Sequence, residues 1–127
     1  MVVLCCALND ETRGMADKIF FDRMKSSGIL VNVGRGDLLD EQALISALNT
    51  GSIDYAILDV FETEPLPESS TIWDHPLIQV TPHSSSRGTM TDPLFDRLFL
   101  DNLRAYLAGG EVRNRVLPGS SLLSNQG

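Results

Sequence analysis

Four polar side chains that could take part in chemistry stand just after short apolar runs of this sequence. Arg35 lies in Asn-Val-Gly-Arg-Gly, Asp59 and Glu64 lie in Leu-Asp-Val-Phe-Glu-Thr-Glu-Pro, and His83 ends Val-Thr-Pro-His. A planar guanidinium holds a carboxylate through two parallel hydrogen bonds. An imidazole donates or accepts a proton near neutral pH, and a neighbouring carboxylate favours its charged form. Together these groups suit proton and hydride transfer on a 2-oxo acid.

The segments that must position these groups alternate between β-branched runs and helical patterns. We predict strands at residues 2–6, 29–33, 55–60 and 77–81, and helices at residues 16–24, 40–49 and 92–107. Strands that alternate with helices are typical of a parallel α/β sheet. In open sheets of this kind, ligands collect beyond the carboxyl ends of the strands. We therefore expect all four polar groups to share one edge of the sheet.

The two shorter helices carry apolar residues at helical spacing. The first is expected to turn Ile19, Phe20 and Met24 toward the core. Asp40 is a suitable N-cap for the second helix, and Gly51 stands just past its end. The residues of the second helix that are expected to face inward are Ala43, Leu44, Ala47 and Leu48.

Composition narrows the class of protein. The 127 residues allow one domain, and 43% of them are hydrophobic, which is enough for a core. The formal net charge is -7 and there is no basic cluster, so we expect no nucleic-acid partner, since phosphates require the opposite balance. No apolar run approaches the roughly 20 residues that cross a bilayer, so we expect no membrane partner.

The two cysteines, Cys5 and Cys6, are adjacent in the sequence. On a strand they would point to opposite faces, which makes them poor candidates for a disulfide and typical of a reducing compartment. A cytoplasmic location is therefore expected. No Cys/His spacing supports a metal site, and no nucleophile-elbow motif accompanies a Ser-His-Asp set.

Several ordered phrases carry a resemblance to a known family. They span residues 8–14, 28–40, 56–67 and 81–83. Over about residues 2–116 the chain resembles the C-terminal part of the NAD-binding domain of the D-isomer-specific 2-hydroxyacid dehydrogenases. The phrase Trp-Asp-His-Pro, which begins at Trp73, resembles the glyoxylate/hydroxypyruvate reductase branch. The resemblance implies an α/β fold: a partial Rossmann-type parallel sheet of about four strands, with flanking helices and a long C-terminal helix.

The Gly-rich phosphate turn and the substrate domain of that family have no counterpart in this sequence. We therefore expect residues 1–117 to be the C-terminal half of a dinucleotide-binding domain, followed by a flexible tail at 118–127. The chain would be a fragment of an NAD(P)-dependent oxidoreductase and inactive alone. Binding of NAD or NADP is expected to be weak or absent, since no helix N-terminus is available for the pyrophosphate. The resemblance also implies a homodimer in the full-length parent.

The resemblance implies a role for each of the four polar groups. Arg35 would bind the carboxylate and the carbonyl of a small 2-oxo acid. His83 would donate a proton to the carbonyl oxygen as hydride arrives from the nicotinamide, and would remove it in the reverse direction. Glu64 would hydrogen-bond the other imidazole nitrogen and fix the tautomer. Asp59 would accept a hydrogen bond from the nicotinamide carboxamide.

The resemblance also marks a set of residues around the cofactor. The expected cofactor-binding residues are Cys6, Ala7, Thr12, Val33, Gly34, Arg35, Asp59, His83 and Ser85. Two of these positions depart from the usual family pattern. The family more often has proline where Ala7 stands, and the serines after His83 replace small and β-branched residues.

Two classes of function remain open from the sequence. One is a dehydrogenase or reductase of small 2-hydroxy and 2-oxo acids. The other is a non-catalytic, dinucleotide-responsive interaction protein, like the transcriptional corepressors that share this fold. Each site residue also has a structural alternative: Arg35 as an ordinary solvated arginine, Glu64 as a loop carboxylate and His83 as a histidine that only ends a strand. The choice between NAD and NADP and the identity of the 2-oxo acid are not determined by these residues.

Overall fold

A computed structural model of the chain describes residues 1–88 and 91–115. Its contacts divide the chain into two compact units, Met1–Ser85 and Ser86–Gly127, and each is described by itself. The domain boundary expected after residue 117 stays a prediction. The tail expected at 118–127 lies outside the described residues.

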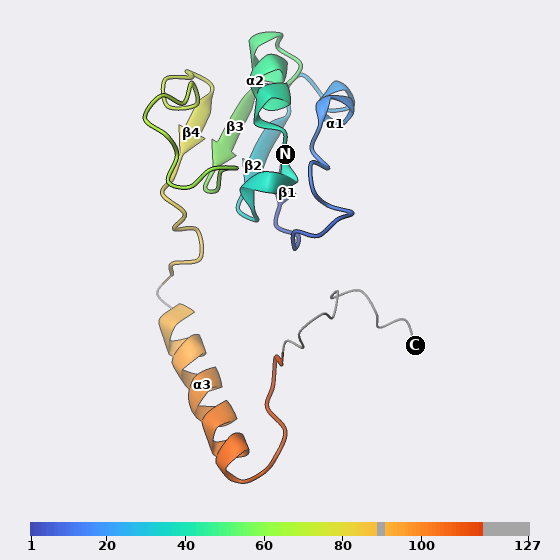
Figure 1. Cartoon of the computed structure of the whole chain (residues 1–127). Helices are drawn as coiled ribbons and strands as arrows, with labels where there is room; N and C mark the ends of the chain where they lie inside the picture. The colour runs from blue at the N-terminus through green and yellow to red at the C-terminus, as the bar shows by residue number, and fades with distance from the viewer. Residues whose placement is uncertain (89–90, 116–127) are drawn as a thin grey trace. The chain divides into compact units, whose positions relative to one another are not determined.

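The first unit is built on a parallel sheet of four strands (Figure 1). The strands are β1 (Val2–Leu4), β2 (Ile29–Asn32), β3 (Tyr55–Leu58) and β4 (Ile78–Val80), and they lie side by side in that order. The register pairs Leu4 with Asn32, and Leu58 with Asn32 and Val80. This arrangement confirms the predicted α/β fold and places the four carboxyl ends at one edge.

Each strand ends one to two residues earlier than the sequence predicts. The ladder nevertheless continues through single backbone hydrogen bonds. The amide of Val33 donates to Leu4, that of Asp59 donates to Asn32, and that of Thr81 donates to Leu58. The backbone of the residues after each strand is therefore fixed by the sheet, which gives the following turns a defined starting point.

Two helices of the first unit begin at aspartate caps. In α1 (Lys18–Asp22) the Asp17 side chain accepts from the amide of Phe20, and in α2 (Glu41–Asn49) the Asp40 side chain accepts from the amide of Ala43. Such caps satisfy amides that the first helical turn leaves without a partner. The buried residues of α2 include Leu44, Ala47 and Leu48, as predicted, while Ala43 is only partly buried.

The prediction for the inner face of α1 was wrong at one position. Ile19 is 59% exposed, whereas Phe21, which was not singled out, is 1% exposed. α1 has only five residues between its N-cap at Asp17 and its C-cap at Arg23, so the helix is too short for a repeating apolar stripe to fix its orientation. Phe20 and Met24 do pack against the core and are partly buried. The rings of Phe20 and Phe21 meet edge to face, with their centroids 5.5 Å apart.

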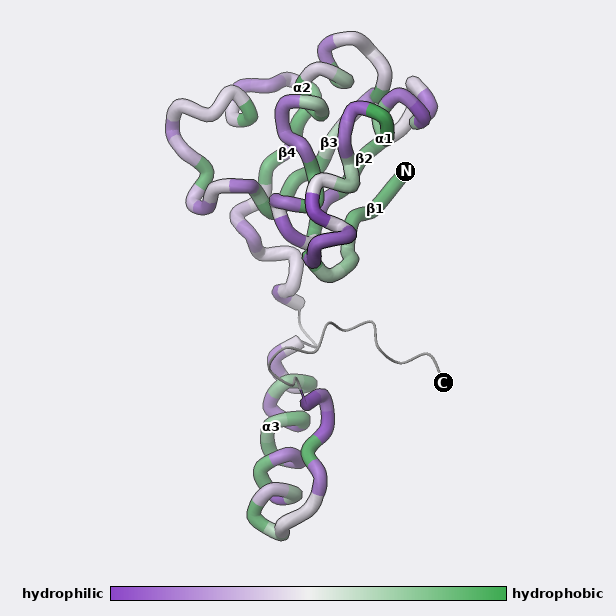
Figure 2. Tube along the Cα trace, turned by 45° about the vertical axis from the view of Figure 1, so that its right-hand side comes forward, coloured by the Kyte–Doolittle hydropathy of each residue, from purple (hydrophilic) through white to green (hydrophobic). Residues whose placement is uncertain are grey.

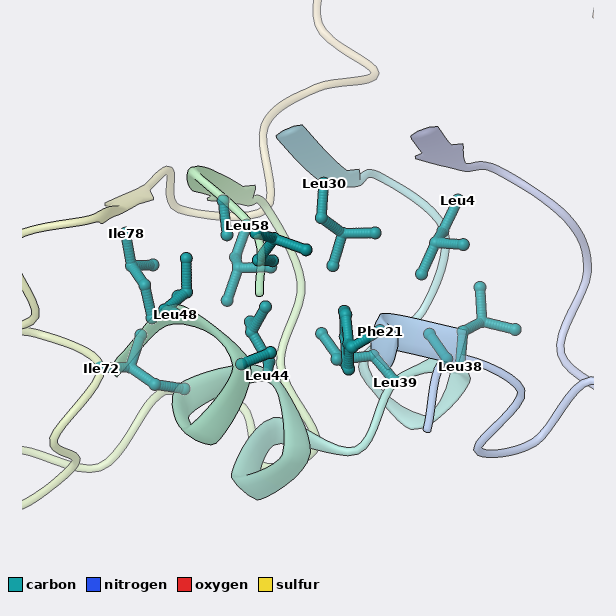
Figure 3. Close-up of a cluster of buried hydrophobic side chains, with 14 of the residues drawn as sticks. Leu4, Phe21, Leu30, Leu38, Leu39, Leu44, Leu48, Leu58, Ile72 and Ile78 are labelled. Atoms are coloured by element: carbon teal, nitrogen blue, oxygen red, sulfur yellow. The ribbon is translucent and has the colours of Figure 1, made fainter. Parts of the chain in front are cut away.

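The core lies between one face of the sheet and the helices (Figure 3). Side chains from alternate strand positions point toward the helices, as the twofold period of a strand requires. The labelled members of this cluster are Leu4, Phe21, Leu30, Leu38, Leu39, Leu44, Leu48, Leu58, Ile72 and Ile78. A buried face of this kind anchors the strands, so that their carboxyl ends form a rigid platform.

The second unit contains α3 (Thr91–Leu107), which confirms the predicted long helix. Hydrophobic and hydrophilic residues alternate along its whole length (Figure 2), and none of its residues is buried. Asn102 joins the helix to the segment that follows it, because its side chain both donates to and accepts from the backbone of Arg113. Within the described residues, no helix is long and apolar enough to cross a membrane.

Candidate active site

The turn after β2 is held by a buried amide. Asn32 is 0% exposed, and its side chain accepts from the amide of Gly34 at 3.1 Å and donates to the carbonyl of Arg35 at 3.0 Å. The side chain of Arg35 is exposed, and its guanidinium donates to the carbonyl of Gly34 at 2.7 Å. The backbone of Arg35 is thus fixed from within the protein while its charged end stays accessible to a ligand.

A close backbone approach presses this turn against the turn after β3. A Cβ built on Gly36 would lie 1.9 Å from the carbonyl carbon of Phe61 and 2.3 Å from the amide nitrogen of Glu62. Only glycine fits between two backbones at this separation. This contact brings Arg35 beside the loop that carries Glu64. Gly36 therefore allows the charged side chain next to it to lie close to Glu64.

Glu64 and His83 form a hydrogen-bonded pair. One carboxylate oxygen of Glu64 lies 2.7 Å from Nδ1 of His83, and the other accepts from the amide of Phe61 at 3.0 Å. The hydrogen bond with His83 is the largest cause that lowers the pKa of Glu64, followed by that from Phe61 and by the charges of His83 and Arg35, while burial opposes them. Glu64 is therefore held as a carboxylate against one ring nitrogen of His83. The opposite nitrogen, Nε2, remains for a substrate.

Asp59 is buried at the end of β3 and accepts three hydrogen bonds from the turn after β4. The Thr81 hydroxyl lies 2.5 Å from one oxygen, which also accepts from the amide of Ser84 at 2.9 Å, and the other oxygen accepts from the amide of Ser85 at 2.9 Å. Burial raises the pKa of Asp59, but the hydrogen bonds from Thr81, Ser85 and Ser84 together lower it well below its usual range. The structure thus directs both oxygens of Asp59 to protein donors.

Five of the expected cofactor residues line one hollow. Its volume is about 660 Å³, and its walls are Cys5, Cys6, Ala7, Leu8, Val33, Gly34 and Arg35. These walls come from the loop after β1 and the turn after β2, at the same edge of the sheet as the polar groups. The side chains are small or apolar apart from Arg35, which suits a flat ring that is bound by backbone and by shape. The residues present therefore fit part of a dinucleotide.

The remaining expected cofactor residues lie elsewhere. The Thr12 hydroxyl donates to the carbonyl of Ala7 at 2.8 Å, and its amide donates to the Asn9 side chain, so Thr12 shapes the loop instead of lining the hollow. Ser85 is exposed and its amide is bound by Asp59. In the structure Thr12 and Asp59 thus serve the protein itself, and their direct contact with a cofactor stays a prediction.

A second hollow, of about 540 Å³, borders the Glu64–His83 pair. Its walls are mostly apolar and comprise Phe61, Glu64, Pro65, Leu66, Trp73, Val80, Thr81, Pro82 and His83. Trp73 is 50% exposed, and its indole nitrogen donates to the carbonyl of Pro67 at 2.9 Å. This indole therefore packs the loop together. The structure brings Glu64 and His83 to one hollow and Arg35 to the other.

Two residues of this site were not singled out from the sequence. Asn32 and Thr81 position the turns of Arg35 and His83, but each reads in the sequence as an ordinary strand residue. The available signal was a polar side chain at or near the end of an apolar run, where a polar group that is taken out of water needs a hydrogen-bond partner. In the described part of the chain, no group of three or more His, Cys, Asp or Glu residues could hold a metal ion.

Comparisons with known proteins give a family for this geometry. Residues 1–85 match the family described as D-isomer specific 2-hydroxyacid dehydrogenase, NAD binding domain. A glyoxylate/hydroxypyruvate reductase B of Serratia proteamaculans is 43% identical over 117 residues, which are 92% of this chain and 36% of that protein. The chain thus spans about a third of the length of the curated relatives it matches.

Solved structures that resemble this chain belong to the same family as the relatives found by sequence. A D-isomer specific 2-hydroxyacid dehydrogenase of Xanthobacter autotrophicus, in complex with NADPH and MES, has a TM-score of 0.81 and 38% identity, and the match covers 92% of this chain and 48% of that one. An NADPH-dependent glyoxylate/hydroxypyruvate reductase of Sinorhizobium meliloti has a TM-score of 0.79 and 28% identity over 90% and 37% of the two chains. The chain therefore belongs to the D-isomer-specific 2-hydroxyacid dehydrogenase family, through its NAD-binding domain.

Proposed function

We propose that this chain is part of an NAD(P)-dependent reductase of small 2-oxo acids such as glyoxylate or hydroxypyruvate, which oxidises the matching 2-hydroxy acids in reverse, and that the chain alone is inactive. The observation that carries this proposal is the Glu64–His83 pair, whose oxygen and Nδ1 lie 2.7 Å apart while the charge of Arg35 is close enough to lower the pKa of Glu64. The names of the bacterial relatives that match over 92% of this chain support the same substrates.

The chemistry follows from what each side chain can do. Arg35 binds the substrate carboxylate through its guanidinium, which places the keto carbon beside the hollow of about 660 Å³. A nicotinamide cofactor held by the residues of this hollow would supply the hydride that reduces that carbon. His83 donates the proton on Nε2 to the carbonyl oxygen, while Glu64 accepts the hydrogen bond from Nδ1–H and stabilises the imidazolium before transfer. In the reverse direction neutral His83 removes the hydroxyl proton.

Several features of the whole protein belong to the same proposal. The hollow formed by residues 5–8 and 33–35 would take the nicotinamide end of NAD or NADP. The free cysteines Cys5 and Cys6 support a reducing, cytoplasmic compartment. Exposed apolar side chains along α3, including Phe95 and Phe99, support a second copy as partner in a homodimer. Weak or absent cofactor binding by this chain alone remains our expectation, to be measured by calorimetric titration with NADH and NADPH.

A hybrid enzyme tests the proposal. In it, this chain replaces the matching 117-residue stretch of the Serratia proteamaculans reductase, to which it is 43% identical. We expect the hybrid to oxidise NADPH in the presence of glyoxylate. His83→Ala should lower kcat by about 10²- to 10⁴-fold, the usual contribution of a positioned acid or base. The control is His75→Gln, the other histidine of the chain, which should stay within about twofold. A hybrid that melts cooperatively but reduces no 2-oxo acid, or that keeps its kcat without His83, would refute the proposal.

A further inference from the structure

The two cysteines of the chain, Cys5 and Cys6, are neighbours in the candidate cofactor hollow, and both are free thiols. We propose that this thiol pair is a modification site, at which one thiol forms a mixed disulfide with a small anionic disulfide such as oxidised glutathione, and that the adduct excludes the cofactor. The effect on activity rests on the proposed function. The modification itself can be observed on the chain alone.

The position of the pair differs from that expected for a strand. β1 ends at Leu4, so Cys5 and Cys6 lie in the loop that follows it. The alternation of faces that holds along a strand therefore does not apply to them. Both residues are exposed, and both border the hollow of about 660 Å³. A hollow of this size accepts a small molecule, so the pair is accessible to a reagent of the size of a tripeptide.

The charge of the hollow favours an anionic reagent. Among its walls, Arg35 is the only charged residue. Its guanidinium donates to the carbonyl of Gly34, and a guanidinium has five N–H donors in all. The remaining donors are suited to bind a carboxylate of glutathione beside the thiols. Exposed thiols next to a cation are typical of cysteines that react.

A contact between two sulfur atoms places the thiol of Cys6. Its Sγ lies 3.7 Å from Sδ of Met15, and the thiol donates to this thioether. A thiol is a weak donor and a thioether a weak acceptor, so the contact orients the thiol and opposes the loss of its proton only weakly. The thiolate is the form that attacks a disulfide. Two adducts on adjacent residues would have to share one hollow, so we expect one adduct per chain.

The reaction is a thiol–disulfide exchange. The thiolate of one cysteine attacks a sulfur of oxidised glutathione, a new S–S bond forms as the old one breaks, and the released glutathione takes up the proton that the cysteine lost. The cysteine is oxidised, and one half of the reagent is reduced. Excess thiol reverses the adduct, so the pair stays free in a reducing compartment. Because the bound tripeptide would occupy the hollow proposed for the nicotinamide end, adduct and cofactor exclude each other.

Mass spectrometry of the intact chain tests the site without a cofactor. The chain holds no cysteine besides this pair, so every adduct reports on it. We expect one glutathionyl group per folded chain, and Arg35→Gln should slow its formation by about two- to fivefold, the contribution of an exposed ion pair. The same substitution should leave the reaction with 2-hydroxyethyl disulfide, a neutral reagent, within about twofold.

Arg13→Gln is the matched control, because it makes the same change in net charge outside the hollow, where Arg13 pairs with Asp37. It should leave the rates with both reagents as they are in the native chain. Absence of an adduct on the folded chain, or an adduct that forms only in urea, would overturn the proposal. Equal slowing by Arg13→Gln and Arg35→Gln would also overturn it, since the reagent would then respond to net charge alone.

Competition in the hybrid enzyme tests whether adduct and cofactor share the hollow. NADPH at about ten times its Kd should slow glutathionylation of the pair by about tenfold, because only the unoccupied hollow reacts, and peptide mapping assigns the adduct. The glutathionylated hybrid should lose NADPH binding and regain it with dithiothreitol. In the double variant Cys5→Ser, Cys6→Ser, the Kd for NADPH should be the same before and after treatment with oxidised glutathione.

The outcomes separate this site from the proposed function. Glutathionylation at the same rate with and without bound NADPH, or an unchanged Kd for NADPH in the modified hybrid, would overturn the proposal. A hybrid in which NADPH protects the pair but which reduces no 2-oxo acid would support the modification site and refute only the proposed function.

Discussion

Two turns at the carboxyl edge of the sheet present the reactive groups, and different chemistry holds each of them. The turn of Arg35 is held by the amide of Asn32, which contacts residues only two and three positions away. The turn of His83 is held by the carboxylate of Asp59, whose partners lie 22 to 26 positions further along the chain. The side-chain hydrogen bonds of the Arg35 turn are thus local in sequence, whereas those of the His83 turn form only once β3 and β4 have paired.

The difference follows from what each turn must do. The Arg35 turn supplies one donor and one acceptor, which an amide satisfies with its two ends. The His83 turn supplies three donors and contains a left-handed residue, which a buried carboxylate satisfies and restrains. Because the His83 turn is held by a side chain at the end of β3, the geometry of the histidine depends on the pairing of β3 with β4.

The largest expected effect comes from separating the Arg35 turn from the turn that follows β3. Gly36→Ala would place a methyl group 1.9 Å from the carbonyl carbon of Phe61. Because both sides of this contact are backbone, the turns after β2 and β3 would have to move apart. We expect the free energy of unfolding to fall by about 4 kcal/mol or more, as for severe overpacking, which urea denaturation followed by circular dichroism would measure.

Gly51→Ala is the control for that substitution. Gly51 has a φ of +71° and no atom within 4 Å of a built Cβ, so alanine there should cost only the left-handed penalty of about 1–2 kcal/mol. Equal losses for the two variants would show that the close approach at Gly36 contributes nothing beyond ordinary backbone preference.

Truncation of Asp59 and of Asn32 to alanine compares how much each side chain stabilises its turn. Asp59→Ala leaves three partly buried donors without their partner, and we expect a loss of about 3 kcal/mol in the free energy of unfolding. Asn32→Ala leaves one donor and one acceptor, both neutral, and should cost about 1.5 kcal/mol. Thermal and urea unfolding of both variants would measure the ratio. A greater cost for Asn32→Ala would reverse our ranking of the two turns.

The pH dependence of stability should distinguish the carboxylate from the amide. Hydrogen bonding lowers the pKa of Asp59 in the folded protein below its value of about 3.9 in an unfolded chain. The unfolded state then binds more protons at acidic pH, so this stabilisation is present above about pH 4 and is lost as the pH falls through the folded pKa. We expect Asp59 to contribute a loss of about 1 kcal/mol between pH 4 and pH 3.

Urea unfolding at a series of pH values gives the measurement. Asp59→Asn should flatten the acid limb of the stability curve, whereas Asn32→Ala should leave its slope unchanged and only shift the curve downward. An acid limb that is the same in the native chain and in Asp59→Asn would mean that the pKa of Asp59 does not differ between the folded and unfolded states.

The smallest effect is expected at a surface contact near the Arg35 turn. Arg13 and Asp37 form an ion pair of 2.8 Å, but their side chains are 59% and 40% exposed. Water and salt screen such pairs. Arg13→Ala should therefore change the free energy of unfolding by less than about 0.5 kcal/mol. A larger loss would show that this ion pair also stabilises the Arg35 turn, whose stability we attribute to Asn32 and to the close contact at Gly36.

The contrast between the turns also explains what the sequence could predict. Periodicity and caps identified the four strands and three α-helices that the described residues form, because apolar alternation and the aspartate cap at Asp40 are local signals. Parallel pairing then placed Arg35, Glu64 and His83 at one edge. Short elements were less predictable, as the five-residue α1 illustrates by burying Phe21 in place of Ile19.

The roles of the buried polar residues were harder to predict. The side chain of Asp59 accepts hydrogen bonds from Thr81, Ser84 and Ser85, more than twenty residues away, and its expected contact with the nicotinamide stays a prediction. No sequence pattern reports which strand lies next to β3 or how a left-handed histidine is restrained. The close approach at Gly36 was likewise invisible, because a glycine beside an arginine is compatible with a loop, a turn or a ligand contact.

A crystal structure of the hybrid enzyme with NADPH and oxamate, a non-reacting analogue of a 2-oxo acid, tests the central claim most directly. We predict that the oxamate carboxylate lies on the guanidinium of Arg35 and that Nε2 of His83 lies about 3 Å from the oxamate carbonyl oxygen, with Glu64 still bound to Nδ1. Oxamate bound away from either side chain, or His83 turned so that Nε2 faces the protein, would contradict the account.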